Sequence, residues 1–474
     1  MPAPATRLLI AVLTAIVTLI GKVDVARSED AATTTMKHLL ESADPIERAI
    51  ALDRLRYGIR GAGRSPTSGD QNATRAFAGL LADMAPDRQA ELVAALGERG
   101  DSTALPSIMR LLESSTDARV RSACLIAFGE LGGVEAARIV ALLERSLTAQ
   151  DPEKTAARRG LVQLRGPDVS RVIVAAISDP NSRLRTTMID VAADRRETAA
   201  LPALLAAAVG MDAGVRSTAM RALSKLGGAE QVKGMVAGQL AATVGNERND
   251  AERALAQVCK QNPGHEQSAD RFLDIFKTAG DEDRKSLLPV LGRIGGPGAL
   301  AIVDELVGSG DPFRRAFGLE ALTKWPDATV ADRLLKLIAE TKDPKERDLF
   351  LSALIRIAPL PDNTLNDAQK LDLLKKAMGL CQQDADRSRV LERANAIRTI
   401  EAFRFVLPYV DQPTLAEPAC RSIVELAHHQ KLRDVHKEEF VKGLDKVIAI
   451  TKDAENIERA GRYKEGKTWE RKKS

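Results

Sequence analysis

Apolar residues along most of this chain fall three or four positions apart, which is the spacing of one buried face of an α-helix. Val120, Ala127 and Leu131, for example, share one helical face. A Gly-Gly pair follows at 132–133, and glycine accepts the left-handed conformation that ends many helices. A shorter apolar segment comes next. The pattern therefore predicts successive pairs of antiparallel helices.

Aspartate marks the start of each predicted pair. Its carboxylate accepts hydrogen bonds from the free N–H groups of a first helical turn, and a proline after it removes no donor that the helix needs. Starts recur about thirty residues apart, and units of this size must stack to bury their apolar faces. Asp-Pro pairs occur at Asp44, Asp151, Asp179, Asp311 and Asp343, and an arginine lies four residues after an aspartate at Arg48, Arg121, Arg216, Arg315 and Arg347.

On these aspartates and arginines the chain resembles the HEAT-repeat superfamily over residues 36–450. The resemblance is to its short bacterial form, like the phycobilisome lyases, and to exported HEAT-repeat proteins of planctomycete-type bacteria. It implies an all-α fold, an α-solenoid or superhelix of about ten to twelve stacked antiparallel helix pairs. It also implies that the aspartates and arginines form a ladder between adjacent units, so we expect Arg315 and Arg347 to bridge neighbouring units.

Residues 1–28 do not share the repeat pattern. An uncharged run from Leu8 to Ile20 is too short to span a bilayer comfortably, and small residues stand at Ala26 and Ser28. This pattern is typical of a signal peptide cleaved before Glu29. We expect an exported protein, periplasmic or extracellular. An N-terminal membrane anchor formed by an uncleaved signal segment is the alternative.

The solenoid is expected over residues 29–453, with two interruptions. Residues 58–73 are rich in Gly and Ser and predict a loop insert, and residues 359–367 predict an irregular break. Residues 454–474 lose the apolar periodicity and predict a basic, polar C-terminal tail.

Charge and composition argue against a nucleic-acid partner. The formal net charge of the chain is +4, but residues 1–28 and 459–474 together carry a net charge above +4. Residues 29–458 are therefore slightly acidic. Aromatic residues make up only 3% of the chain. A solenoid that binds nucleic acid needs a basic face along its length, with aromatic residues if it holds single strands.

Few residues suggest a metal site. Deoxyhypusine hydroxylase, also a HEAT protein, holds two irons with four His-Glu pairs, whereas this chain has only His265-Glu266. Glu425 and His428 would share one helical face, as in di-iron bundles, and His436 follows nearby. A single motif of this kind is weak support, so no metal ligand, cofactor-binding residue or cofactor is predicted.

Other chemical motifs have structural interpretations. The glycine-rich segment 292–298 has no preceding strand and aligns with the other helix ends, so it predicts a helix terminus and not a phosphate loop. No catalytic residues are predicted. The four cysteines have no metal-binding spacing and are predicted to be buried free thiols: Cys124, Cys259, Cys381 and Cys420. Cys381 and Cys420 are the pair to check for a disulfide.

Three classes of function remain open. The first is a non-enzymatic scaffold that binds another protein through its solenoid surface. Similar repeats are often joined to cytochrome or sugar-dehydrogenase modules, but this chain has no CxxCH motif, so such a redox partner would be a separate cytochrome or dehydrogenase. The second is a cofactor-handling enzyme or lyase-like chaperone. The third is a self-associating structural protein of the cell envelope.

Overall fold

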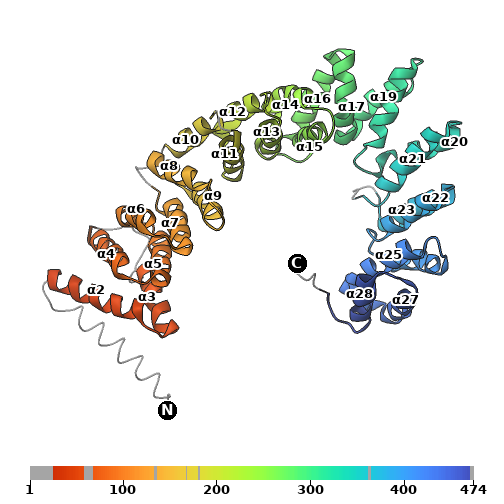
Figure 1. Ribbon diagram of the computed structural model, residues 1–474. Coiled ribbons are helices and arrows are strands. Elements are labelled where there is room, and N and C mark those ends of the chain that lie inside the picture. The colour runs from red at the N-terminus through yellow and green to blue at the C-terminus, as the bar shows by residue number, and fades with distance from the viewer. Residues whose placement is uncertain are drawn as a thin grey trace. The chain divides into compact units, whose positions relative to one another are not determined.

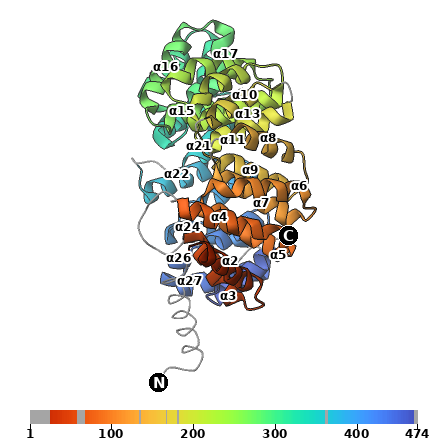
Figure 2. The same ribbon diagram turned by 90° about the vertical axis from the view of Figure 1, so that its left-hand side faces the viewer.

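The computed structural model describes residues 25–57, 68–132, 136–166, 168–179, 182–360 and 365–469. These residues form helices joined mainly by short turns, and they contain no strand. The chain divides into two compact units, residues 1–226 and residues 227–474, called here the first and second units. Figures 1 and 2 show consecutive helices stacked side by side within each unit. The fold is an all-α solenoid, as the sequence predicted.

The first unit holds two rows of helices (Figure 1). Within its A row, α5 packs on α7 and α7 on α9. The A row contains α3 (Pro45–Tyr57), α5 (Pro86–Arg99), α7 (Ala118–Leu131), α9 (Glu153–Gln163), α11 (Ser182–Asp194) and α13 (Ala213–Leu226). The B row contains α4 (Ser68–Gly79), α6 (Leu105–Ser114), α8 (Ala136–Ser146), α10 (Val169–Ile177) and α12 (Leu201–Ala208), with α2 (Val25–Glu41) preceding α3 and 3₁₀ turns at η1 (Leu80–Asp83), η2 (Ser102–Ala104) and η3 (Thr198–Ala200).

The second unit repeats this arrangement. Its A row contains α15 (Asn246–Lys260), α17 (Asp281–Ile294), α19 (Pro312–Thr323), α21 (Pro344–Ile357), α23 (Asp384–Ala394) and α25 (Ala416–His428). Its B row contains α14 (Val232–Ala241), α16 (His265–Thr278), α18 (Gly296–Val307), α20 (Ala331–Glu340), α22 (Asp367–Leu380) and α24 (Ile400–Val406). The unit also has η4 (Ala229–Gln231), η5 (Ala328–Val330) and η6 (Leu407–Asp411), and it ends with α26 (Gln430–Val435), α27 (Lys437–Ile450) and α28 (Ala454–Lys464).

The core of each unit lies between the two rows. In the first unit Leu125 and Phe128 of α7 are fully buried. In the second unit Trp325, just after α19, is fully buried and its indole Nε1 donates to Thr329 Oγ1 at 3.0 Å. This bond satisfies the one polar atom of the buried indole, so Trp325 fixes the turn between α19 and η5 to the core.

Two glycines allow the backbones of α7 and α9 to approach closely. A Cβ atom on Gly129 of α7 would lie 2.5 Å from the carbonyl oxygen of Gly160, on α9. A Cβ atom on Gly160 would in turn meet the carbonyl oxygen of Leu125. No side chain fits at either position without movement of the backbone. The small residues therefore set the spacing of these two A-row helices.

The predicted interruptions are only partly described. Residues 68–73, placed in the loop insert, instead form the first half of α4, while 58–67 lie outside the described residues. Residues 1–24 of the expected signal segment also lie outside them, and 25–28 begin α2. Around the break, α21 ends at Ile357 and α22 begins at Asp367, with 361–364 outside the described residues.

The C-terminal segment differs from the polar tail that the sequence predicted. Residues 454–464 form α28, which packs on both α25 and α27. Ala460 and Tyr463 are buried, and the guanidinium of Arg459 lies 5.8 Å from the ring centroid of Tyr463 and 5.0 Å from that of Trp469. The buried Tyr463 and the stacking of the Arg459 guanidinium on two aromatic rings stabilise this helix, and a count of charged residues does not reveal them.

Candidate interaction surface

The predicted aspartate caps are present at the start of A-row helices. Asp117 Oδ1 accepts from the backbone N–H groups of Arg119 at 2.8 Å and Val120 at 3.3 Å. The side-chain and backbone bonds from Arg119 lower the pKa of Asp117. Asp311 and Asp343 accept in the same way from the second residue after each of them. These carboxylates satisfy donors that a helix leaves unpaired at its N-terminus.

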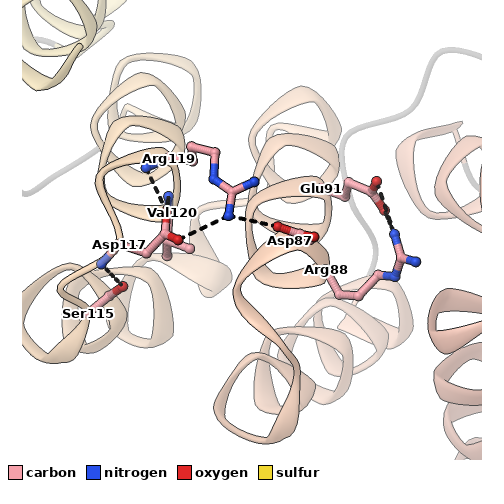
Figure 3. Close-up of polar contacts among 7 residues, drawn as sticks. All are labelled: Asp87, Arg88, Glu91, Ser115, Asp117, Arg119 and Val120. Atoms are coloured by element: carbon pink, nitrogen blue, oxygen red, sulfur yellow. Dashed lines mark hydrogen bonds and ion pairs between the residues drawn. The ribbon is translucent and has the colours of Figure 1, made fainter. Parts of the chain in front are cut away.

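Arg119 links two successive A-row helices (Figure 3). Its Nη2 atom lies 3.1 Å from Asp117 Oδ2 on its own helix and 2.8 Å from Asp87 Oδ1 on α5. Figure 3 shows the guanidinium between the two carboxylates. Arg119 and Asp87 are both well exposed, so the contact contributes orientation and little free energy.

The arginine four residues after each aspartate has a different role from the one expected. Arg121 Nη1 donates to the carbonyl oxygen of Leu112 at 2.6 Å, and Arg315 Nη1 donates to that of Val307 at 3.2 Å. These carbonyls belong to the last turn of the preceding B-row helix. Arg315 thus bridges two units, as expected, but through a backbone carbonyl and not through an Asp-Arg ladder.

Arg347 departs from the expectation more clearly. Its Nη2 atom donates to the carbonyl oxygen of Leu380, at the end of α22, which is the B-row partner of its own helix. The expected bridge to a neighbouring unit was therefore wrong for Arg347. The guanidinium still satisfies an unpaired carbonyl at a helix C-terminus, which is the property it shares with Arg121 and Arg315.

A second group of arginines connects neighbouring A-row helices, and the sequence analysis missed it. In the first unit Arg195 Nη1 donates to the carbonyl oxygen of Leu164 at 2.7 Å. In the second unit Arg356 Nη2 donates to that of Trp325 at 2.6 Å, and Arg393 Nη2 to that of Arg356 at 2.9 Å. The sequence feature that could have predicted these contacts is a basic residue at the end of an A-row helix, because cations are favourable at helix C-termini.

Burial and like charge act on these arginines together. Burial lowers the pKa of Arg356, and the charges of Arg393 and Arg293 lower it further. Burial also lowers the pKa of Arg393. Both guanidinium groups remain cations at neutral pH because an arginine pKa starts far above it. The C-terminal ends of α17, α21 and α23 therefore gather positive charge on one side of the second unit.

The histidine candidates are engaged in other contacts. Glu425 Oε1 binds Arg459 Nη1 at 2.7 Å, while His428 Nδ1 lies 2.8 Å from Tyr463 Oη. Both contacts join α25 to α28. His265 and Glu266 begin α16 and are exposed. Across the described ranges, no three His, Cys, Asp or Glu side chains come together in a way that could hold a metal ion.

The glycine and cysteine interpretations are confirmed. Segment 292–298 ends α17 and begins α18, with Gly295 at a φ of 66°. The four thiols are free and buried, and no disulfide joins Cys381 to Cys420. Burial raises the pKa of Cys124 and Cys259 to about 12. A thiol with so high a pKa is a poor nucleophile at neutral pH.

Two open grooves flank α20 in the second unit. One, of about 520 Å³, lies against Val307, Arg315 and Lys336, and the other, of about 630 Å³, lies against Asn366, Gln369 and Lys376. Asp332 lines both grooves. Both grooves are open and carry charged side chains of both signs, whereas small-molecule sites are usually enclosed and mostly apolar.

Comparison with known proteins identifies the repeat. Residues 74–162 match the sequence model of HEAT repeats. The chain contains HEAT repeats. The matched region covers η1, α5, η2, α6, α7 and α8 with half of α4 and most of α9. The aspartate cap, the carbonyl-binding arginine and the paired glycines described above lie within it. No curated protein matches the sequence as a relative.

Several solved structures are similar to this HEAT-repeat chain. The karyopherin Kap121p bound to the SUMO protease Ulp1p has 14% identity and a TM-score of 0.44, covering 92% of this chain and 53% of that one. Kap121p bound to Pho4p has 14% identity and a TM-score of 0.43, covering 96% and 57%. Kap95p, in a structure describing its effect on the switch loops of RanGDP, has 12% identity and a TM-score of 0.43, covering 92% and 59%. This chain spans little more than half the length of these proteins.

None of the described helices has the length and apolar character needed to cross a membrane.

Proposed function

We propose that this HEAT-repeat protein is a non-enzymatic scaffold that binds another protein through side chains exposed on its helical rows. The observation that carries the proposal is the repeated exposure of large apolar residues where A-row helices begin. Ile46 and Met211 in the first unit are 64% and 101% exposed. Val244 and Phe313 in the second unit are 82% and 76% exposed. Each lies within two residues of an A-row N-cap.

Single exposed apolar residues are ordinary on protein surfaces, but these four gather at the starts of A-row helices, one residue before the N-cap or two residues after it. Large exposed side chains on a rigid array provide many small contacts along a partner. The polar side chains support this interpretation, because Asp117, Arg121 and Glu425 bind helix termini or another side chain.

A crosslinked purification tests the proposal. A tagged full chain is crosslinked in its native cells and purified from the cell envelope, and each recovered protein is then expressed and mixed with the purified chain. We expect one partner, such as a separate cytochrome or dehydrogenase, to re-form a complex of fixed stoichiometry. Recovery of the tagged chain alone, with assembly that depends on its own concentration, would instead show a self-associating protein.

We also propose that the protein is exported, on the strength of the apolar run and small residues within residues 1–28. N-terminal sequencing of the protein from the periplasmic fraction should begin at Glu29. An intact N-terminus in the membrane fraction would instead support an anchor, and recovery in the cytoplasm would contradict export.

A further inference from the structure

One face of the second unit combines an apolar patch with unpaired positive charge. Along α19, residues Phe313 and Phe317 are separated by four positions, and Lys324 follows seven later. At 3.6 residues per turn, these offsets place all three residues on the same helical face. Phe313 is 76% exposed, Phe317 is half-buried and Lys324 is exposed. The apolar residues thus occupy the N-terminal half of this face, and the cation lies at its C-terminal end.

The neighbouring helix α21 repeats part of this arrangement, with Lys345 in place of Phe313. Lys345, Leu349 and Arg356 have the same offsets from one another as Phe313, Phe317 and Lys324. Leu349 is 45% exposed. Its position corresponds to that of Phe317 on α19. The apolar patch therefore extends across two A-row helices.

Hydrogen bonds fix the lateral order of these helices. Arg356 donates to the carbonyl oxygen of Thr323, immediately before Lys324, at 2.9 Å. Arg393 on α23 donates in turn to the carbonyl oxygen of Arg356. The three cations therefore follow one another across α19, α21 and α23. We call the set formed by Phe313, Phe317, Leu349, Lys324, Arg356 and Arg393 the docking strip.

Among the described residues no ion pair joins a carboxylate to the positive charges of the docking strip, although Lys324 interacts with Glu252 at longer range. Arg356 and Arg393 bind backbone carbonyls, and Lys324 forms no ion pair there. Glu252, the buried carboxylate whose charge interacts with Lys324, is already paired with Arg293 at 3.6 Å. Glu320 is the one carboxylate on the same face of α19, so positive charge remains in excess.

We propose that the docking strip binds an acidic protein segment that carries a bulky apolar side chain. The apolar side chain would contact Phe313, Phe317 and Leu349, while carboxylates of the same segment would lie against Lys324, Arg356 and Arg393. This inference rests on the proposed scaffold function and specifies the chemistry of its partner. Both features are needed, because charge alone attracts any polyanion and exposed apolar area alone does not select sequence.

Selection from a displayed library of random 15-residue peptides on the full chain tests this inference. The enriched peptides should combine Asp or Glu with Phe, Leu or Ile, and their affinity should fall as salt is raised. Phe313→Ser, Leu349→Ser and Lys324→Glu should each weaken the best peptide by about tenfold. These side chains are exposed or half-exposed, so the variants should keep the helical circular dichroism of the wild type.

Matched controls lie elsewhere on the second unit. Val435→Ser removes an equally exposed apolar side chain on α26, and Lys233→Glu reverses an exposed charge on α14. Both should leave peptide affinity within about twofold of wild type. Enrichment of basic peptides, absence of any binding peptide, or equal effects in controls and strip variants would overturn the inference.

A polyanion gives a separate outcome. If Lys324→Glu abolishes binding while Phe313→Ser and Leu349→Ser have no effect, and single-stranded DNA competes, the strip binds charge without an apolar anchor and the inference is wrong. The scaffold proposal has its own test. A purified partner that still binds all three strip variants would leave the scaffold in place while refuting the docking strip.

Discussion

Arginine is the residue on which the helix ends of this protein depend. A guanidinium carries five N–H donors in a fixed plane, so it can reach carbonyl oxygens that a helix leaves unpaired at its C-terminus. Arg195 donates to three carbonyls of the preceding A-row helix, those of Leu161, Val162 and Leu164. Lysine has a compact charge without this fork, and we expect it to replace arginine poorly at such positions.

Gly129→Ala should destabilise the first unit. The new Cβ would lie 2.5 Å from the carbonyl oxygen of Gly160, and this backbone atom cannot move aside as a flexible side chain would. We expect the free energy of unfolding to fall by about 2 kcal/mol, measured by denaturant titration. Gly79→Ala is the control, because its Cβ would meet nothing within 4 Å. If both variants unfold alike, α7 and α9 are not in the close contact described.

Glu252→Gln should stabilise the second unit at pH 7. Glu252 is 5% exposed, and burial raises its pKa although the charge of Arg293 opposes this. A raised pKa means that the folded state binds the proton more tightly, so wild-type stability falls as pH rises from the ordinary glutamate value through the raised one. The uncharged amide avoids this loss. We expect a gain of about 1 kcal/mol or less at pH 7.

The pH dependence distinguishes this account of Glu252 from a packing effect. Below pH 4 the wild-type carboxyl is protonated in both states, so the advantage of Gln should disappear there. Glu305→Gln, at an exposed position of α18, is the control and should change stability little at either pH. An advantage of Glu252→Gln that persists unchanged at low pH would contradict the proposed origin.

At the scale of the element, the junction between α18 and α19 combines two complementary ends. The aspartate accepts from the N-terminal N–H groups of an A-row helix, and the arginine four residues later donates to the last carbonyls of the B-row helix before it. Both helix ends thus receive opposite charge, which also suits the helix dipole. The sequence predicted the caps because their donors are local. It could not specify the carbonyl partners, since these depend on how the preceding helix ends.

Arg315→Ala should weaken one such junction without removing a helix. Loss of its bond to the Val307 carbonyl should lower the free energy of unfolding by about 1 kcal/mol, while circular dichroism keeps its helical intensity. Arg314→Ala is the control, because Arg314 is exposed and lies 4.0 Å from Asp311. A variant at Arg315 as stable as the one at Arg314 would show that the carbonyl contact contributes nothing measurable.

At the scale of the whole molecule, the last repeat must be covered, because a stack otherwise ends in an open apolar face. Helix α28 covers α25 and α27, and Tyr463 is 1% exposed. Deleting residues 454–474 should lower Tm by about 5 °C and cause association that grows with concentration, measured by light scattering. Deleting 470–474 alone should do neither. A truncated chain that stays monomeric with an unchanged Tm would refute this role.

The sequence predicted the class of fold better than the candidate surface. Helix periods, caps and glycine stops are local signals, so the paired helices from 86 to 131 could be anticipated. The docking strip could not, because Phe317, Leu349 and Arg356 come together only when α19 and α21 are placed side by side. The covered C-terminus was missed for a similar reason, since Tyr463 is buried by helices that precede it.

The junction described around Asp311 and Arg315 also bears on how such a chain can lengthen. Both residues lie in the first turn of one helix, and their partners lie within the same turn or in the last turn of the helix before. A duplication of one complete repeat copies both halves of the contact, so the inserted repeat fits at either border. A duplication of half a repeat leaves one helix end without its partner. Whole repeats are therefore the natural unit of insertion and loss in this protein.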